Sequence, residues 1–125
     1  MDQKICLDTD ISIEILKNTE IGIDFVDSMG GNEAFISTVS VFELFMREKN
    51  LYPVEELLFK THILDFTELS ARKASEIFKD LKSSGKMIDM RDLFIAAIAI
   101  TNNCTLATLN KKHFENIKEL KLLRF

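Results

Sequence analysis

Five acidic residues lie beside apolar runs of the chain instead of within charged segments. Asp8 and Asp10 follow the run KICL, Glu43 lies inside VSVFELFM, and Asp89 and Asp92 lie just before LFIAAIAI. An ionised carboxylate beside a hydrophobic core is costly unless a cation, a hydrogen-bond donor or a metal ion compensates it. Converging carboxylates also repel one another, and a hard cation such as Mg²⁺ or Mn²⁺ is the usual relief. The pattern therefore favours metal-assisted chemistry.

Four of these acids also have simple structural explanations. Asp10 suits the N-cap of a helix that begins at residue 11 or 12, and Asp8 could close an Asx-turn after a strand. Asp89 could cap a helix that begins at Met90, and Asp92 would then lie at the positive end of that helix dipole.

Glu43 is the acid that is hardest to explain structurally. Its apolar neighbours leave it little solvent-facing surface, so a structural role would require a cationic partner. Arg47, four residues further along the same helix, could supply one. Taken together, the structural explanations for the five acids require several coincidences.

Size and charge restrict the classes of function. With 125 residues, 46% of them hydrophobic and 29% charged, the sequence is typical of one globular domain, which we assign to residues 1–125. It carries 16 basic and 20 acidic residues, a formal net charge of −4. Proteins that hold nucleic acid by phosphate neutralisation alone usually have a basic excess. A nucleic-acid ligand would therefore require a bound cation and a local basic rim.

The sequence predicts an intracellular, cytoplasmic location without membrane association. The acidic start MDQKICLDTD lacks the basic and then apolar plan of a signal peptide. The longest apolar run, residues 93–100, is much shorter than the roughly 20 residues of a membrane span. Cys6 and Cys104 are expected to be reduced and buried, because their spacing fits neither a zinc site nor a disulfide framework.

Short apolar runs alternate with segments of helical periodicity. We predict strands at 4–7, 34–36, 62–66, 105–108 and 121–123, and helices at 12–17, 21–29, 40–49, 53–59, 70–84 and 90–101. This alternation is typical of an α/β sandwich with parallel strands. Ligands of such sheets bind at the carboxyl ends of the strands, which is where Asp8 falls.

The sequence resembles the PIN-domain proteins, and especially the VapC-type toxins of toxin–antitoxin pairs. The resemblance rests on CLDTDISIEIL, STVSVFELFMRE, GKMIDMRDLFIAAIAITNNCTLATLN and KKHFENIKEL, and it runs from about residue 4 to 122. Its most specific part is the pattern DxxIAAxAxxxxxTLxTxN that begins at Asp92. The resemblance implies a three-layer α/β/α sandwich around a mainly parallel sheet. It also implies Mg²⁺- or Mn²⁺-dependent endoribonuclease activity, a homodimer and inhibition by a cognate antitoxin.

The resemblance assigns the site residues by position. The family's catalytic and metal-binding acids fall on Asp8, Glu43 and Asp92, and its fourth polar position falls on Asn110. Since Asn110 can ligate through its carbonyl oxygen but brings no charge, one firmly held metal is expected in preference to two. The expected chemistry is an in-line attack on a phosphodiester by a metal-activated water, with Glu43 orienting or deprotonating that water.

Basic residues near these acids are candidates for binding RNA phosphates. They are Arg91, Lys86, Lys111 and Lys112, although lysines at helix ends are often simply solvated. His113 is expected to face solvent on a short helix.

Three alternatives to a toxin ribonuclease stay open. The chain could be a degenerate PIN-domain binding module, or a solitary RNA-processing nuclease. A receiver-type or phosphatase-like domain would require a phosphate-contacting lysine after a late strand, and Lys111 is only loosely placed for that. If there is an antitoxin, the early helices offer it apolar residues that would otherwise be core: Ile15, Leu16, Phe25, Phe42 and Phe45.

Overall fold

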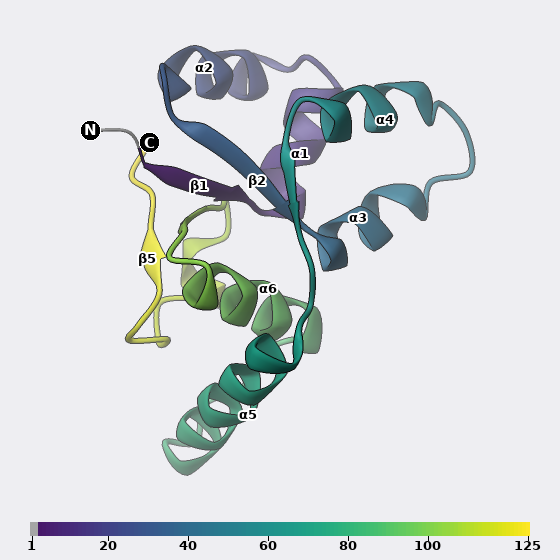
Figure 1. Ribbon diagram of the computed structural model, residues 1–125. Helices are drawn as coiled ribbons and strands as arrows, with labels where there is room; N and C mark the ends of the chain where they lie inside the picture. The colour runs from purple at the N-terminus through teal and green to yellow at the C-terminus, as the bar shows by residue number, and fades with distance from the viewer. Residues whose placement is uncertain (1–2) are drawn as a thin grey trace.

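Five parallel strands form the centre of the molecule in a computed structural model that describes residues 3–125 (Figure 1). They are β1 (Lys4–Leu7), β2 (Glu33–Ser37), β3 (His62–Leu64), β4 (Thr105–Ala107) and β5 (Lys121–Leu122). Their order in the sheet is β3-β2-β1-β4-β5, and all four pairings are parallel. The chain therefore begins in the middle of the sheet, and β1 ends between β2 and β4.

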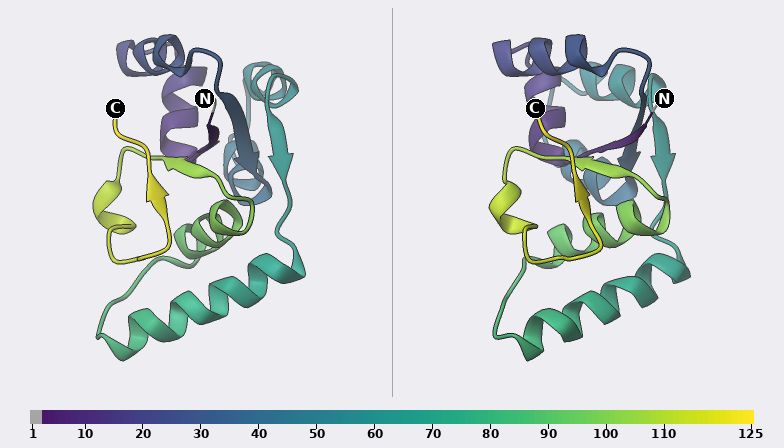
Figure 2. Two further views of the ribbon diagram at one scale, coloured as in Figure 1. Left: turned by 60° about the vertical axis from the view of Figure 1, so that its left-hand side comes forward. Right: turned by 90° about the vertical axis from the view of Figure 1, so that its left-hand side faces the viewer.

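Helices cover both faces of this sheet, which confirms the predicted α/β/α sandwich. The helices are α1 (Thr9–Leu16), α2 (Glu20–Met29), α3 (Thr38–Phe45), α4 (Tyr52–Phe59), α5 (Glu68–Ser83) and α6 (Met90–Thr101). Figure 2 shows α5 and α6 on one side of the strands and α1, α2 and α4 on the other. A 3₁₀ turn, Lys111–His113, follows β4.

The hydrophobic core has two parts because successive strand residues point to opposite faces. Cys6 and Leu106 pack toward the buried sides of α5 and α6. Ile5, Leu7 and Ile36 pack on the other face with residues of α1, α2 and α4. With both faces covered, the strands need apolar residues at consecutive positions, which explains why they lack an alternating pattern.

The two cysteines are free and buried, as expected. Cys6 lies in β1 and Cys104 directly precedes β4, and burial raises the pKa of both thiols. They therefore behave as small apolar residues of the core.

Helix α2 approaches α1 closely at Gly22. A Cβ atom at this position would lie 2.3 Å from the carbonyl oxygen of Glu14, which is less than any real contact allows. Thr19 begins α2 by accepting a hydrogen bond from the Gly22 backbone at its hydroxyl. No helix within residues 3–125 combines the length and the apolar character needed to cross a bilayer.

Candidate active site

Asp8 follows β1 and caps the N-terminus of α1. Its side chain is buried, with 5% of the residue exposed. Oδ1 accepts a hydrogen bond from the Thr9 backbone N–H (2.8 Å), and Oδ2 accepts one from the Thr108 hydroxyl at the end of β4 (2.8 Å). Burial, with smaller contributions from the charges of Asp10 and Asp92, raises the pKa of Asp8 to about 7. Ionised Asp8 is thus a carboxylate that the protein itself compensates poorly.

Asp10 does not cap α1, so that prediction is wrong. Because the helix begins at Thr9, Asp10 lies in its first turn. Its Oδ2 atom accepts hydrogen bonds from the Leu109 backbone N–H (3.0 Å) and the Asn110 side-chain amide (3.0 Å), and lies 3.2 Å from the hydroxyl of Thr108. Asp10 therefore fixes the loop that follows β4 against the start of α1.

Glu43 lies on α3 with 18% of its side chain exposed, and each of its carboxylate oxygens has a partner. Oε1 accepts a hydrogen bond from the Thr9 hydroxyl at 2.7 Å, and Oε2 lies 3.4 Å from Nη1 of Arg91. The cation beside this acid is therefore Arg91, which also approaches Asp89 (Nε to Oδ1, 3.6 Å), and not Arg47, which lies beyond the end of α3 at Phe45.

Asp92 is the third residue of α6. The side chain of Asp89 caps this helix by accepting from the Arg91 backbone N–H (2.8 Å), which confirms that predicted role. Burial and the charge of Asp89, with a smaller effect from Glu43, raise the pKa of Asp92, while His113 acts in the opposite direction. His113 is exposed, as expected, but its Nδ1 atom also lies 3.3 Å from Oδ2 of Asp92.

The fold brings the three predicted acids to the carboxyl edge of the sheet. Thr9 contacts both Asp8 and Glu43, and the charge of Asp92 contributes to the raised pKa of Asp8. This donor set consists of carboxylate oxygens, the ligands that suit a hard divalent cation. Each acid is turned toward donors of the protein, and as the side chains lie, no group of three acids, histidines or cysteines in residues 3–125 is arranged to hold a metal ion.

The other predicted site residues are used in different ways. The side-chain amide of Asn110 points its nitrogen at Asp10. Lys111 turns inward, with Nζ 3.3 Å from the Thr108 carbonyl oxygen and 4.4 Å from the centre of the Phe125 ring. Lys86 and Lys112 are exposed.

Sequence reasoning missed two hydroxyl residues of the site, Thr9 and Thr108. Both lie just beyond the end of a strand: Thr9 comes two residues after the end of β1, and Thr108 comes directly after β4. Because β1 and β4 are neighbours, hydroxyls at these positions lie at the same edge of the sheet. The threonine in LDTD and the second threonine in TLAT were the available signals.

The comparisons with known proteins agree on one family. The PIN domain model matches residues 5–120. Ribonuclease VapC1 of Methanocaldococcus jannaschii is 35% identical over 125 residues, covering 97% of this chain and 86% of the relative. Ribonuclease VapC2 of Haemophilus influenzae is 30% identical, covering 94% and 95%.

A solved structure extends the likeness to three dimensions. VapBC2 from Rickettsia felis, bound to a DNA fragment from its promoter, contains a chain that superposes with a TM-score of 0.86 and 25% identity, covering 98% of this chain and 99% of that one. The chain therefore belongs to the PIN domain family and, within it, to the VapC ribonucleases of VapBC toxin–antitoxin systems.

Proposed function

We propose that this ribonuclease cleaves RNA with Mg²⁺ or Mn²⁺ at a site formed by Asp8, Glu43 and Asp92. The observation that carries the proposal is the state of Asp8. It is buried, its pKa is raised by burial and by the charges of Asp10 and Asp92, and it takes part in no ion pair among residues 3–125. A divalent cation is the compensation that this carboxylate lacks.

In this proposal, Asp8 and Asp92 hold the cation directly or through water, and Glu43 completes the set. The bound cation supplies charge stabilisation at a phosphate oxygen and lowers the pKa of a water molecule. Glu43 orients this water or accepts its proton, because Thr9 and Arg91 hold its carboxylate beside the other acids. Asn110 is a weaker candidate ligand, since its amide nitrogen is directed at Asp10.

The proposed RNA contacts come from basic residues around this edge. Arg91 is half exposed beside Glu43, and Lys86 and Lys112 are exposed. Lys111 is less available because its ammonium group contacts the Phe125 ring and a backbone carbonyl. Replacing Lys112 with Ala should weaken RNA binding in a salt-dependent manner more than replacing Lys111.

The direct test compares the variant Asp92→Asn with the control Asp80→Asn, an exposed acid near the end of α5. We expect the first to lose metal-dependent RNA cleavage and Mn²⁺ binding by calorimetry, with an unchanged circular dichroism spectrum, and the second to keep all three. Normal cleavage by Asp92→Asn would show that the site is assigned wrongly. A wild type that neither binds Mn²⁺ nor cleaves RNA would support the degenerate binding module instead.

We also propose that an antitoxin protein inhibits the chain by occupying an apolar groove between α1, α2 and α4. The groove has a volume of about 550 Å³. Of the apolar residues that the sequence offers for an antitoxin, Ile15, Leu16 and Phe25 line this groove, whereas Phe42 and Phe45 on α3 do not. An amphipathic segment is the partner that suits such a groove.

Two residues of α2 provide a matched test of this surface. Val26 lines the groove, while Ile23 is exposed to the same extent on that helix and does not line it. Where the gene of a small DNA-binding protein adjoins that of this chain, its product should copurify with the wild type and with Ile23→Arg, but not with Val26→Arg. Equal recovery with both variants would place the antitoxin elsewhere, and the lack of such a gene would favour a solitary RNA-processing nuclease.

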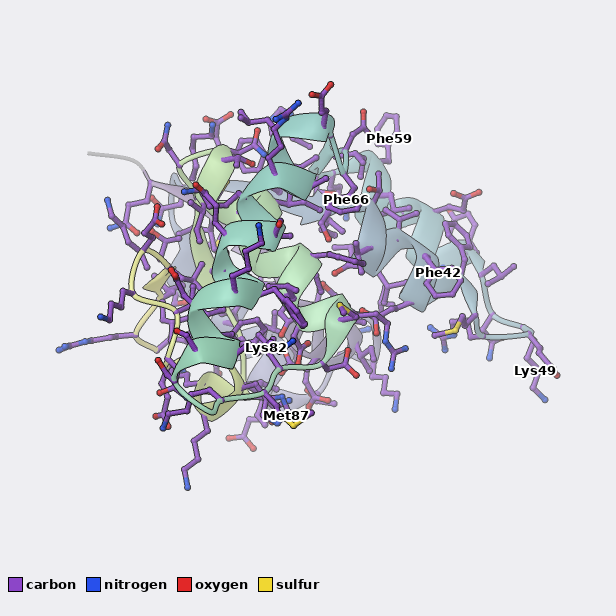
Figure 3. All side chains as sticks on the ribbon, turned by 90° about the horizontal axis from the view of Figure 1, so that it is seen from below. Phe42, Lys49, Phe59, Phe66, Lys82 and Met87 are labelled. Carbon is purple, nitrogen blue, oxygen red and sulfur yellow. The ribbon has the colours of Figure 1, made fainter. Side chains whose placement is uncertain are left out.

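We propose further that the chain forms a homodimer through an apolar surface made of Phe42, Phe66, Leu69 and Met90. All four side chains are exposed, Phe42 by 59%. These residues belong to adjoining elements: the Phe66 backbone N–H donates to the Thr38 hydroxyl, one turn before Phe42, and the Phe66 ring packs on Phe94, one turn after Met90. In Figure 3, Phe42 and Phe66 lie on the half of the molecule away from Met87.

Light scattering after size exclusion tests this dimer. Phe42→Glu should shift the protein to the mass of a monomer. The control Phe59→Glu changes the most exposed phenylalanine, which is outside the proposed surface, and should leave the dimer intact. A monomeric wild type at micromolar concentration would refute the proposal.

A further inference from the structure

Thr9 makes a separate contact with each of two proposed catalytic acids. Its backbone N–H donates to Oδ1 of Asp8 at 2.8 Å, and its hydroxyl lies 2.7 Å from Oε1 of Glu43. The two acids come from different elements: Asp8 follows β1, and Glu43 lies in α3. Thr9 therefore spans the gap between the end of the central strand and the helix that carries Glu43.

The direction of the hydroxyl bond follows from proton counting. The Thr9 hydroxyl lies 2.9 Å from that of Ser40 as well as 2.7 Å from Glu43, but it has only one proton to give. A carboxylate is the stronger acceptor, so Thr9 donates to Glu43. The fully buried Ser40 hydroxyl oxygen is a second, longer acceptor beside the same Thr9 hydroxyl, at 2.9 Å. Thr9 is thus held at its backbone and at its hydroxyl.

We infer that Thr9 is a positioning residue for RNA cleavage, which sets the placement of the Glu43 carboxylate relative to Asp8. The inference rests on the proposed function of these two acids. Arg91 also approaches Glu43, but its 3.4 Å contact is longer and its side chain is half exposed. The short bond from the partly buried Thr9 is therefore the main constraint on the direction in which Glu43 points.

This constraint matters for the rate more than for substrate binding. Glu43 extends from a helix on a side chain with three rotatable bonds, and without a partner at Oε1 it can adopt other rotamers. A general base or ligand displaced by about 1 Å lowers the rate by up to roughly 100-fold. RNA phosphates are held by other residues, so loss of the Thr9 hydroxyl should reduce kcat and leave KM nearly unchanged.

Valine and serine at position 9 form a matched pair of variants. Thr9→Val keeps the β-branched shape and the backbone bond to Asp8 but removes the hydroxyl, while Thr9→Ser keeps the hydroxyl and removes only a methyl group. We expect Thr9→Val to lower kcat roughly 10- to 100-fold with KM within about twofold, and Thr9→Ser to retain kcat within about threefold. Equal kcat for Thr9→Val and the wild type would overturn the inference.

A second measurement requires neither metal nor RNA. In EDTA, the urea midpoints of Thr9→Val, Glu43→Ala and the double variant form a cycle that reports whether the two side chains interact. We expect the shifts to be non-additive, because removing the hydroxyl costs less once the carboxylate is gone. Additive shifts would mean that the bond is not formed in solution, and would overturn the inference even if Thr9→Val folds poorly.

The two proposals fail in distinguishable ways. If Asp92→Asn cleaves RNA normally, the proposed site is wrong, whatever position 9 does. If Asp92→Asn is inactive while Thr9→Val cleaves at the wild-type rate, the site stands and Thr9 does not position it.

Discussion

Replacing Asp8 with Asn should make the protein more stable while abolishing its activity. In metal-free solution at pH 8, the wild type must keep a buried carboxylate ionised against its tendency to protonate. Asparagine removes that charge and preserves the hydrogen bonds. Its Oδ1 atom can accept from Thr9, and its Nδ2 atom can donate to Thr108, whose own proton then goes to Asp10, 3.2 Å away.

The size and pH dependence of the gain follow from the pKa of Asp8. It rises from an ordinary 3.8 to about 7 in the folded protein, which corresponds to at most about 4.5 kcal/mol at about 1.4 kcal/mol per pH unit. Because the folded state binds the proton more tightly, ionisation of Asp8 opposes folding. This cost is absent below pH 4, grows between pH 4 and 7 and is constant above. We expect Asp8→Asn to raise the free energy of unfolding by about 2–4 kcal/mol at pH 8.

Urea unfolding in EDTA, followed by circular dichroism at several pH values between 4.5 and 8.5, measures this gain. The difference between Asp8→Asn and the wild type should shrink as the pH falls from 7 toward 4. Added Mn²⁺ should raise the stability of the wild type much more than that of the variant, because binding to the folded state alone stabilises it. A variant that is less stable than the wild type at pH 8, or a gain that does not depend on pH, would refute the reasoning.

Two further changes test the surroundings of the site and the packing of the helices. Asp10→Ala should speed hydrogen exchange at the Leu109 amide and lower the free energy of unfolding by about 1 kcal/mol. Asp10→Asn, which keeps an acceptor oxygen, should show smaller effects on both. Unchanged exchange in Asp10→Ala would mean that other contacts hold the loop. Gly22→Ala should lower stability by about 1–3 kcal/mol in thermal unfolding, since its methyl group would meet the Glu14 carbonyl, while Ser28→Ala on the same helix should change it little.

Local patterns were sufficient to predict the elements and layers of the fold, but not its connections. The predicted bounds of α6, residues 90–101, match the structure, because its central apolar run is too long for a strand and is largely buried. The start of α1 was placed three residues late, since Asp8 and Asp10 are equally good caps when only neighbouring residues are considered. The strand order depends on crossover connections, on which short apolar runs carry no information.

The acids of the proposed site could be predicted from the sequence, but the residues that contact them could not. Glu43 is conspicuous because a charge among hydrophobic residues needs compensation, and this conflict is visible in the sequence itself. The contacts of Glu43 are not visible in the sequence, because Thr9 is 34 positions from Glu43 and Arg91 is even further away. Arg47 was the only candidate that helical spacing could offer, and the fold placed a residue of another helix there instead.

The bond between Asp8 and Thr108 joins residues that are 100 positions apart, and this has a consequence for synthesis on the ribosome. The strands β1, β2 and β3 all emerge before β4, and Asp92 also lies in the last third of the chain. Domains begin to form from the N-terminus as they are translated, but contacts across such separations must wait for the later partner. A nascent chain therefore lacks the assembled edge of the sheet, and with it the proposed catalytic site, until Thr108 has been synthesised.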